Sequence, residues 1–583
     1  MAAPACGDAL CAFGLALIFF LCGGCFLGVA GIGGSSEARE AHVVSVILRS
    51  GEWILPLRNG VVPSKPMLFH WFDLLPAWAA GVVSPFVARL PSLVFGAGLV
   101  FVVTLLAIRC ARCGESVFAQ RARWFGFVSA FILSSIYGFS GSAMLAMVDM
   151  TFSFWVWLAL IWPVWSIFTV DAPGEVGTPV GKLQMNAFFV TMALAVLCKG
   201  PLGFVLPSIV LFVLLWRQFS LDQALRICFR PRLGWLLFLL LVVPWYVAAT
   251  VKGQADFVGR QFFFENLKRV LGGEDINSEV PWFYFRELLS YAAPWSWVAL
   301  AAAVCPPCRG VAVGERFLRN CGRVFLVGVL LFSLSSGKRQ SYLLPLYPFL
   351  GLFVSWVLFA WFQSSSDWWQ GRWRGVFTFH AWVALFFLSI TIAFTEVLKL
   401  LAPIDILSAE SVDFFVLHSL KLELGALILF VLLGCVVLRG RATTFAAGLI
   451  SYTSFLFIFF AAVGLGRGVK AHLRGFDRQA AAIRSQVGDI EPLFVVRSIA
   501  PETFDPILYY LMREVTLLPR SLPILTDRGY VILKVDDIEP LLQRGVLLPA
   551  QLAGEVGRYN LLVDAARKKS DHAVVLLKIG APG

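Results

Sequence analysis

The sequence predicts a polytopic α-helical membrane protein with a small α/β domain at its C-terminal end. Three observations lead to this prediction. First, 59% of the residues are hydrophobic and only 14% are charged, whereas about a quarter of the residues in a soluble domain are charged. Second, the chain up to about residue 465 consists mainly of apolar runs, many of them near the ~20 residues that cross a bilayer. Third, charged residues become frequent after that point and the apolar runs become short.

About thirteen runs are predicted to span the membrane. The first, 9–32, has no basic segment before it and no small-residue cleavage site after it, so it is expected to be an uncleaved helix rather than a signal peptide. The segment 67–83 carries Asp73 and two Trp and is expected to lie at the interface. The other twelve runs are 86–108, 124–143, 151–170, 184–198, 201–216, 233–250, 288–305, 323–335, 342–362, 375–396, 422–438 and 443–465.

Basic residues predict how these runs are oriented. They gather in alternate loops, at 109–123, 217–232, 306–322 and 439–442, and Lys and Arg are enriched in cytoplasmic loops. The N-terminus is therefore expected in the cytoplasm and the C-terminal domain outside the cytoplasmic (inner) membrane. The outer side then receives the juxtamembrane segment 33–84, a large loop at 251–287 and all residues after 465.

The predicted domains divide at residue 466. Residues 1–465 form the transmembrane domain, and residues 466–583 form a soluble outer domain. Short apolar runs at 492–497, 530–534 and 573–578 are typical of strands, and 536–544 has a helical pattern. Strands that alternate with helices predict a small α/β domain.

The first polar stretch of the chain holds an unusual density of charge. Glu37, Arg39 and Lys65 lie within 29 residues of one another, directly after the first apolar run. Charged residues beside a membrane are costly and usually functional, so we expect them to face an anionic lipid-borne donor. The net charge of +12 comes from basic residues at the ends of apolar runs, which indicates contact with membrane lipids and not with nucleic acid.

Eight short motifs follow one another along almost the whole chain. They are Glu37-Ala38-Arg39, Lys65-Pro66, 88–92, 147–151, 199–201, 244–246, 281–284 and Gly337-Lys338, the last followed by 342–345. This order resembles the GT-C membrane glycosyltransferases, which include the lipid A aminoarabinose transferases and the protein O-mannosyltransferases. The resemblance implies a GT-C fold. It also implies inverting transfer of a sugar from a polyprenyl-phosphate carrier to a lipid A-like glycolipid, an envelope glycan or a protein outside the cytoplasmic membrane.

The resemblance also implies site residues. The family's donor-phosphate lysine corresponds to Lys65, and its outer-face acid corresponds to Asp149. A lipid phosphate that leaves with negative charge requires fixed cations around it, and Arg339 is a further cation of this kind. The residues predicted to bind substrate are Arg39, Lys65, Arg89, Lys199, Lys338 and Tyr342.

The chain departs from the family at two positions. Ser36 stands where the family has a catalytic Asp, and Ser64 stands where the aminoarabinose branch has a Glu beside the Lys-Pro motif. The loop 251–287 also contains no His, so we expect no bound metal and no other cofactor.

With Ser36 in place of the Asp, the base that removes the acceptor proton is left open between Glu37 and Asp149. A phosphate acceptor is already ionised and needs little help from a base. The alternative function is a catalytically degenerate family member that binds polyprenyl-phosphate lipids as a binding or assembly partner. An enzyme should hold a carboxylate and Lys65 around one cavity, whereas a degenerate member should hold the cations alone.

Overall fold

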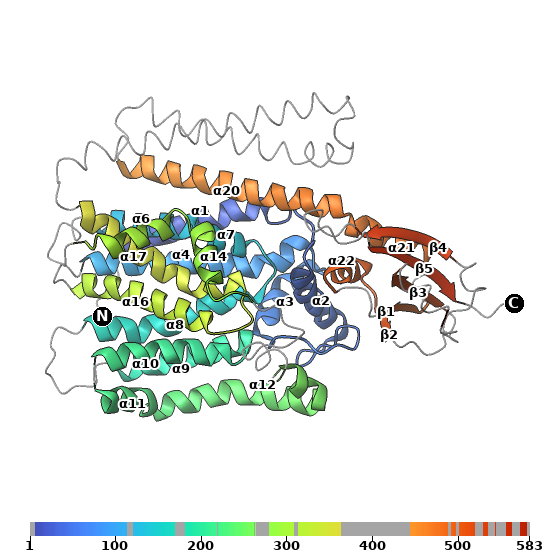
Figure 1. Ribbon diagram of the computed structural model, residues 1–583, viewed down its shortest axis with the longest axis horizontal. Coiled ribbons are helices and arrows are strands. Elements are labelled where there is room, and N and C mark those ends of the chain that lie inside the picture. Colours follow the sequence, from blue (N-terminus) through green and yellow to red (C-terminus); the bar gives the residue numbers. More distant parts are fainter. Residues whose placement is uncertain are drawn as a thin grey trace, which may run out of the picture.

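The computed structural model describes residues 6–112, 121–169, 181–218, 220–261, 263, 279–307, 313–362, 444–487, 491–496, 501–518, 529–534, 543, 555–561 and 572–579. A bundle of long helices fills most of the molecule, and a β-sheet with its helices lies at one end of the bundle (Figure 1). The long helices of the bundle are α1 (Cys6–Phe26), α4 (Pro85–Arg112), α6 (Ala122–Ser135), α8 (Val148–Thr169), α9 (Lys182–Lys199), α10 (Leu202–Gln218), α12 (Arg232–Val258), α16 (Val313–Ser333), α17 (Tyr347–Phe362) and α20 (Thr444–Arg474).

Shorter helices connect or cap these long ones. They are α7 (Tyr137–Ala143), α11 (Leu221–Phe229), α14 (Phe283–Tyr291), α15 (Trp295–Val304) and the 3₁₀ helix η2 (Gln340–Leu346). The predicted run 124–143 is not one straight span, because α6 and α7 meet at an angle of 74°. Ile136, the residue between them, has an extended backbone conformation.

The helices confirm a multi-pass membrane protein. Within the described residues, six helices are long and apolar enough to cross a membrane, or seven if α6 and α7 form one broken span. Three shorter apolar helices cover 148–164, 202–216 and 295–304. The predicted spans 375–396 and 422–438 lie outside the described residues, so the number thirteen stays a prediction.

Two helices of the polar N-terminal stretch lie at the sheet end of the bundle. These are α2 (Ser35–Ser50) and α3 (Leu68–Ala80), which pack against each other (Figure 1). Helix α2 ends at Gly51, whose φ of +69° closes the last turn at little steric cost for glycine. The segment 67–83 therefore contains a short helix, α3, that is too short to span a bilayer.

The C-terminal region is an α/β unit, as the sequence predicts. Its elements are α21 (Phe476–Gln486), β1 (Leu493–Val496), α22 (Pro501–Leu511), β2 (Thr516–Leu518), β3 (Gly529–Lys534), β4 (Glu555–Leu561) and β5 (His572–Ile579). The sheet order is β2-β1-β3-β5-β4; β1 pairs in parallel with β2 and β3, while β5 is antiparallel to β3 and β4.

The three predicted strands are β1, β3 and β5, and they form the centre of the sheet. The sequence prediction missed β2 and β4, which are the edge strands. An edge strand is covered on fewer sides and needs no continuous apolar run: β4 contains Glu555, Arg558 and Asn560. The predicted helix 536–544 lies almost wholly outside the described residues.

Hydrogen bonds connect the α/β unit directly to the bundle end. The hydroxyl of Tyr509 donates to the carbonyl of Val83 at 2.6 Å, and the N–H of Ile32 donates to the hydroxyl of Tyr510 at 2.7 Å. The predicted boundary at residue 466 lies inside α20, which continues as one helix to Arg474. The division into a membrane domain and a separate soluble domain stays a prediction.

Charged residues of the predicted cytoplasmic side contact one another at the other end of the bundle. Near the N-terminus, Asp8 accepts hydrogen bonds from Arg112 at 2.6 Å and from Arg123 at 3.0 Å. Both arginines belong to the first predicted basic loop, 109–123; Arg112 ends α4 and Arg123 lies in the first turn of α6. Asp8, the end of α4 and the start of α6 therefore lie at one end of the bundle. The orientation of this end relative to the membrane stays a prediction.

Candidate functional site

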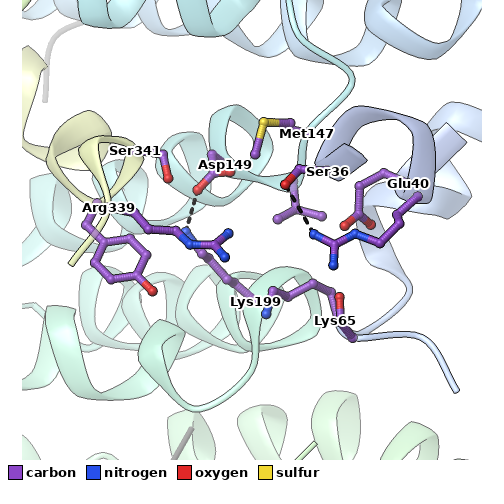
Figure 2. A pocket seen from close by; sticks show the side chains of 12 residues that line it. Ser36, Glu40, Lys65, Met147, Asp149, Lys199, Arg339 and Ser341 are labelled. Carbon is purple, nitrogen blue, oxygen red and sulfur yellow. Dashed lines mark hydrogen bonds and ion pairs between the residues drawn. The ribbon is translucent and has the colours of Figure 1, made fainter. Parts of the chain in front are cut away.

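A polar pocket lies where α2 meets the ends of the bundle helices (Figure 2). About 410 Å³ of space, part of it open to solvent, lies between its lining residues. Four cations and two carboxylates line the pocket, contributed by α2, the loop after α2, α8, α9 and the residue before η2. The lining residues are Ser36, Arg39, Glu40, Ser64, Lys65, Met147, Val148, Asp149, Lys199, Arg339, Ser341 and Tyr342.

Helix ends hold Asp149 and Lys199 in the pocket. Asp149 lies in the first turn of α8, where the helix dipole favours a negative charge. Lys199 is the last residue of α9, and the chain turns away at Gly200 with φ +78° and ψ −152°. This backbone conformation is almost restricted to glycine, so the Lys-Gly-Pro sequence fixes the point at which α9 stops.

Asp149 and Lys199 form a buried ion pair (Figure 2). The Lys199 ammonium also lies 4.8 Å from the centre of the Tyr342 ring and 5.1 Å from that of Phe152. Aromatic faces attract a desolvated cation. Ser341 of η2 also lines the pocket, close to Asp149 (Figure 2). Lys199 therefore keeps its charge at a defined place in the pocket wall.

Arg39 is positioned by one residue of its own helix, α2, and by one residue of the C-terminal α/β unit. Its Nη2 donates to the Ser36 hydroxyl at 3.1 Å, and its Nε lies 3.8 Å from the carboxylate of Asp505 on α22. The same carboxylate accepts from Ser35 at 2.6 Å and from Arg58 at 2.7 Å. The C-terminal unit thus contributes the counter-charge that orients a pocket arginine.

Glu40 reaches the pocket from the same face of α2, and His70 of α3 supports it. The distance between His70 Nε2 and Glu40 Oε2 is 2.8 Å, and the imidazole is fully buried. Burial raises the pKa of Glu40, but the bond and the charge of His70, followed by the charges of Arg39 and Lys65, outweigh it and bring the pKa below its usual value. Glu40 is therefore an ionised carboxylate at neutral pH.

Glu37 and Arg89 do not line the pocket. They form a buried two-point ion pair, with Arg89 Nε 2.7 Å from Oε1 and Nη2 3.0 Å from Oε2. Oε1 also accepts from the N–H of Ala146 at 3.0 Å. Burial raises the pKa of Glu37, but Arg89 and the Ala146 N–H lower it more, so the pKa lies below its usual value. The pair braces the segment that leads into α8 and Asp149.

The pocket brings together five of the eight predicted site residues, Arg39, Lys65, Asp149, Lys199 and Tyr342. Glu37, Arg89 and Lys338 are placed elsewhere. Lys338 donates to the carbonyl of Glu279 at 3.1 Å, while the adjacent Arg339 lines the pocket. The main residue that the sequence prediction missed is Glu40. Helical spacing could have found it, because Ser36, Arg39 and Glu40 stand at i, i+3 and i+4 on one face of α2.

Within the described ranges, no group of three or more His, Cys, Asp or Glu side chains is arranged to hold a metal ion. The position next to Lys65 where the aminoarabinose branch carries a Glu is Ser64, which lines the pocket. A hydroxyl is a poorer ligand for a divalent cation than a carboxylate. The expectation of no metal stays a prediction.

We expect Asp505→Asn to loosen the pocket from the C-terminal side. Asn retains the shape but removes the charge that Arg58 and Arg39 face, and charged hydrogen bonds contribute about 1.5–3 kcal/mol each. Thermal unfolding of the purified protein should begin several degrees lower. The matched control is Asp477→Asn on α21, an exposed position where no change is expected. Equal unfolding temperatures for the two variants would show that Asp505 does not hold the two units together.

Comparisons with known proteins agree with this architecture. Residues 46–257 match the family model described as dolichyl-phosphate-mannose-protein mannosyltransferase. The undecaprenyl phosphate-α-4-amino-4-deoxy-L-arabinose arabinosyl transferase of Pseudomonas aeruginosa (strain UCBPP-PA14) is 29% identical over 321 residues, which are 53% of this chain and 52% of that protein. The protein of that name from Shewanella sediminis is 24% identical over 58% of each chain. The chain spans about half the length of the curated relatives it matches.

A solved structure covers nearly the whole chain. The crystal structure of ArnT from Cupriavidus metallidurans bound to undecaprenyl phosphate aligns with a TM-score of 0.65 over 98% of both chains, at 18% identity. The apo structure of that protein aligns with a TM-score of 0.63 over 96% of this chain and 95% of that one. The likeness confirms the predicted fold, and with the family match it confirms the resemblance to GT-C membrane glycosyltransferases.

Proposed function

We propose that this protein transfers a sugar from a polyprenyl-phosphate donor to an acceptor at the outer face of the cytoplasmic membrane. One observation carries the proposal: Arg39, Lys65, Lys199 and Arg339 surround a single pocket together with the carboxylates of Glu40 and Asp149. Four cations match a phosphate that gains negative charge as it leaves. The two carboxylates are candidate bases for the proton of the acceptor, which sugar transfer requires and lipid binding alone does not.

The chemistry of the leaving group explains the cations. When the bond between the anomeric carbon and the phosphate oxygen breaks, the polyprenyl phosphate departs with the electron pair. Fixed donors at that oxygen stabilise the transition state, and loss of one such donor typically costs 10²–10³ in rate. Arg39 and Arg339 can each bind phosphate through two N–H groups, and Lys65 and Lys199 add point charges.

The position of the pocket suits a donor anchored in a membrane. It lies at the end of the bundle beside α2 and α3, where a lipid phosphate would be at headgroup level. Helix α3 exposes Leu75 and Trp78, and Trp is enriched at the membrane interface. The description of the matching family model names proteins as acceptors, which supports a protein acceptor. Lipid A-like glycolipids and envelope glycans are the other two acceptor classes that we propose.

Turnover by the reconstituted full-length protein tests the proposal. The protein in lipid nanodiscs is supplied with a panel of undecaprenyl-phosphate pentoses and hexoses, together with lipid A, an envelope glycan preparation or a protein acceptor. We expect at least one pair to yield free undecaprenyl phosphate and a glycosylated acceptor, as measured by mass spectrometry. No transfer from any donor, by protein that still binds undecaprenyl phosphate, would contradict the proposed activity.

A second candidate function is a lipid-binding protein without catalysis, which Ser36 and Ser64 favour because both stand where relatives have a carboxylate. The presence of Glu40 and Asp149 in the pocket supports the enzyme instead. The variant Ser36→Asp separates the two. If the natural site is degenerate, restoring the acid should create or greatly increase transfer. If the natural site is complete, the variant should transfer no faster than wild type.

A further inference from the structure

The Glu40–His70 pair is a buried unit that opens on the pocket. Glu40 is 8% exposed and lines the cavity, whereas His70 is fully buried behind it. His70 Nε2 bonds Oε2 of Glu40 at 2.8 Å. Among the described residues, no hydrogen bond reaches the second oxygen, Oε1. One oxygen of this carboxylate is thus held and the other is available to a ligand.

Only one ring nitrogen of His70 has a hydrogen-bond partner among the described residues. Nε2 bonds Glu40 Oε2 at 2.8 Å, whereas Nδ1 is buried and has no partner in the described part of the chain. An N–H on Nδ1 would be a buried donor without an acceptor. The ring is therefore placed to donate its Nε2–H to Glu40.

We propose that Glu40, oriented by His70, is the base that takes the proton from a hydroxyl group of the acceptor. This inference rests on the proposed function and assigns the acceptor nucleophile to the class of neutral hydroxyls rather than ionised phosphates. An ionised phosphate nucleophile has no proton to lose, so it would gain nothing from Glu40. The negative charge of Glu40 would also repel it. Glu40 is the catalytic residue, and His70 is a positioning residue.

The neighbouring carboxylates are occupied in ways that Glu40 is not. Glu37 is buried in its pair with Arg89, and Asp149 is buried in its pair with Lys199. Glu37 and Asp149 each bond an Arg or Lys side chain, which lowers the proton affinity of a carboxylate, whereas the bonded partner of Glu40 is an imidazole. Arg39 and Lys65 also act on Glu40, but the donor phosphate would offset their charge when it binds.

The proposed step balances as follows. The acceptor oxygen forms a bond to the anomeric carbon while its proton passes to Oε1 of Glu40. The bond from that carbon to the phosphate oxygen breaks, and undecaprenyl phosphate leaves with the electron pair among the pocket cations. His70 keeps its own proton on Nε2 and its bond to Oε2 throughout. Glu40 then releases the proton to water.

Four variants test the inference, on the donor and acceptor that wild-type protein uses. Glu40→Gln should lower kcat at least 100-fold while it binds undecaprenyl phosphate within threefold of wild type. Glu52→Gln is the matched control, since Glu52 is not among the described residues that line the pocket and its backbone hydrogen bonds can be kept. His70→Phe should lower kcat at least tenfold with little change in KM, whereas His70→Gln, which retains an N–H donor, should recover most of that loss.

The outcomes separate the inference from the function it rests on. If wild type transfers sugar and Glu40→Gln stays within threefold of it, the inference fails and the proposed function stands. If wild type transfers no sugar, both fail. Should Glu40→Gln not fold, the decision passes to the His70 variants: equal kcat for His70→Phe and wild type would overturn the inference, and rescue by Gln over Phe at equal stability would support it.

Discussion

Replacing Lys199 by Met is expected to lower the rate of sugar transfer by about 10²–10³-fold, as loss of one preorganised donor at a developing negative charge does. The Lys199 side chain is buried between Asp149 and the rings of Phe152 and Tyr342. Its charge therefore acts in surroundings of low dielectric, where it interacts more strongly than it would in water. Met fills a similar volume, so the change removes the charge and little of the packing.

The control for Lys199→Met is Lys338→Met. The sequence predicts both Lys338 and Lys199 as substrate-binding residues. In the structure, however, Lys338 bonds the carbonyl of Glu279 and does not line the pocket. Turnover per folded protein should stay within threefold of wild type in this variant. Lys199→Met alone leaves the buried Asp149 carboxylate without its partner and should lower stability. The double variant Lys199→Met with Asp149→Asn removes that charge too, so it should recover stability but not the rate of transfer. Equal loss of activity in the Lys199 and Lys338 variants would refute the pocket as the site.

The bundle, the α/β unit and most pocket cations could be predicted because each leaves a local mark in the sequence. Apolar runs mark the helices, and Lys199 stands out as a charge at a polar joint between two of them. Helical spacing places Glu40 on one face with Ser36 and Arg39, but it does not separate the role of Glu37 from that of Glu40. The two glutamates are three residues apart in a polar stretch, and only the packing of α2 decides which faces the cavity and which faces Arg89.

The same limit explains Lys338 and Arg339. They are adjacent, equally basic and part of one motif, yet neighbouring side chains point in different directions as the chain enters η2. Arg89 illustrates a second limit. Its partners include the carbonyls of Leu27, Ala30 and Gly31, which lie about sixty residues earlier in the chain. A sequence pattern does not indicate which backbone carbonyls lack a hydrogen-bond donor. The structural role of Arg89 could therefore not be predicted, and the sequence suggested a substrate ligand instead.

Arg89→Met is expected to cause the largest loss of stability, about 3–5 kcal/mol, the usual cost of removing one partner from a buried ion pair. All five N–H groups of Arg89 are used, two on Glu37 and three on the carbonyls of Leu27, Ala30 and Gly31. The variant leaves the Glu37 carboxylate buried beside Ala146 without a counter-charge. Little folded protein should be recovered from membranes, as measured by size-exclusion chromatography and thermal unfolding.

Variants of Glu37 decide whether this pair is structural or catalytic. If it is structural, Glu37→Gln lowers the unfolding temperature, because one amide N–H now faces an N–H of Arg89, but turnover per folded protein stays within threefold of wild type. The double variant Arg89→Met with Glu37→Met should be more stable than Arg89→Met alone, since no unpaired charge is left in the interior. A fall of 100-fold in turnover for Glu37→Gln, at an unchanged unfolding temperature, would instead make Glu37, one of the two candidates from the sequence, the base in place of Glu40.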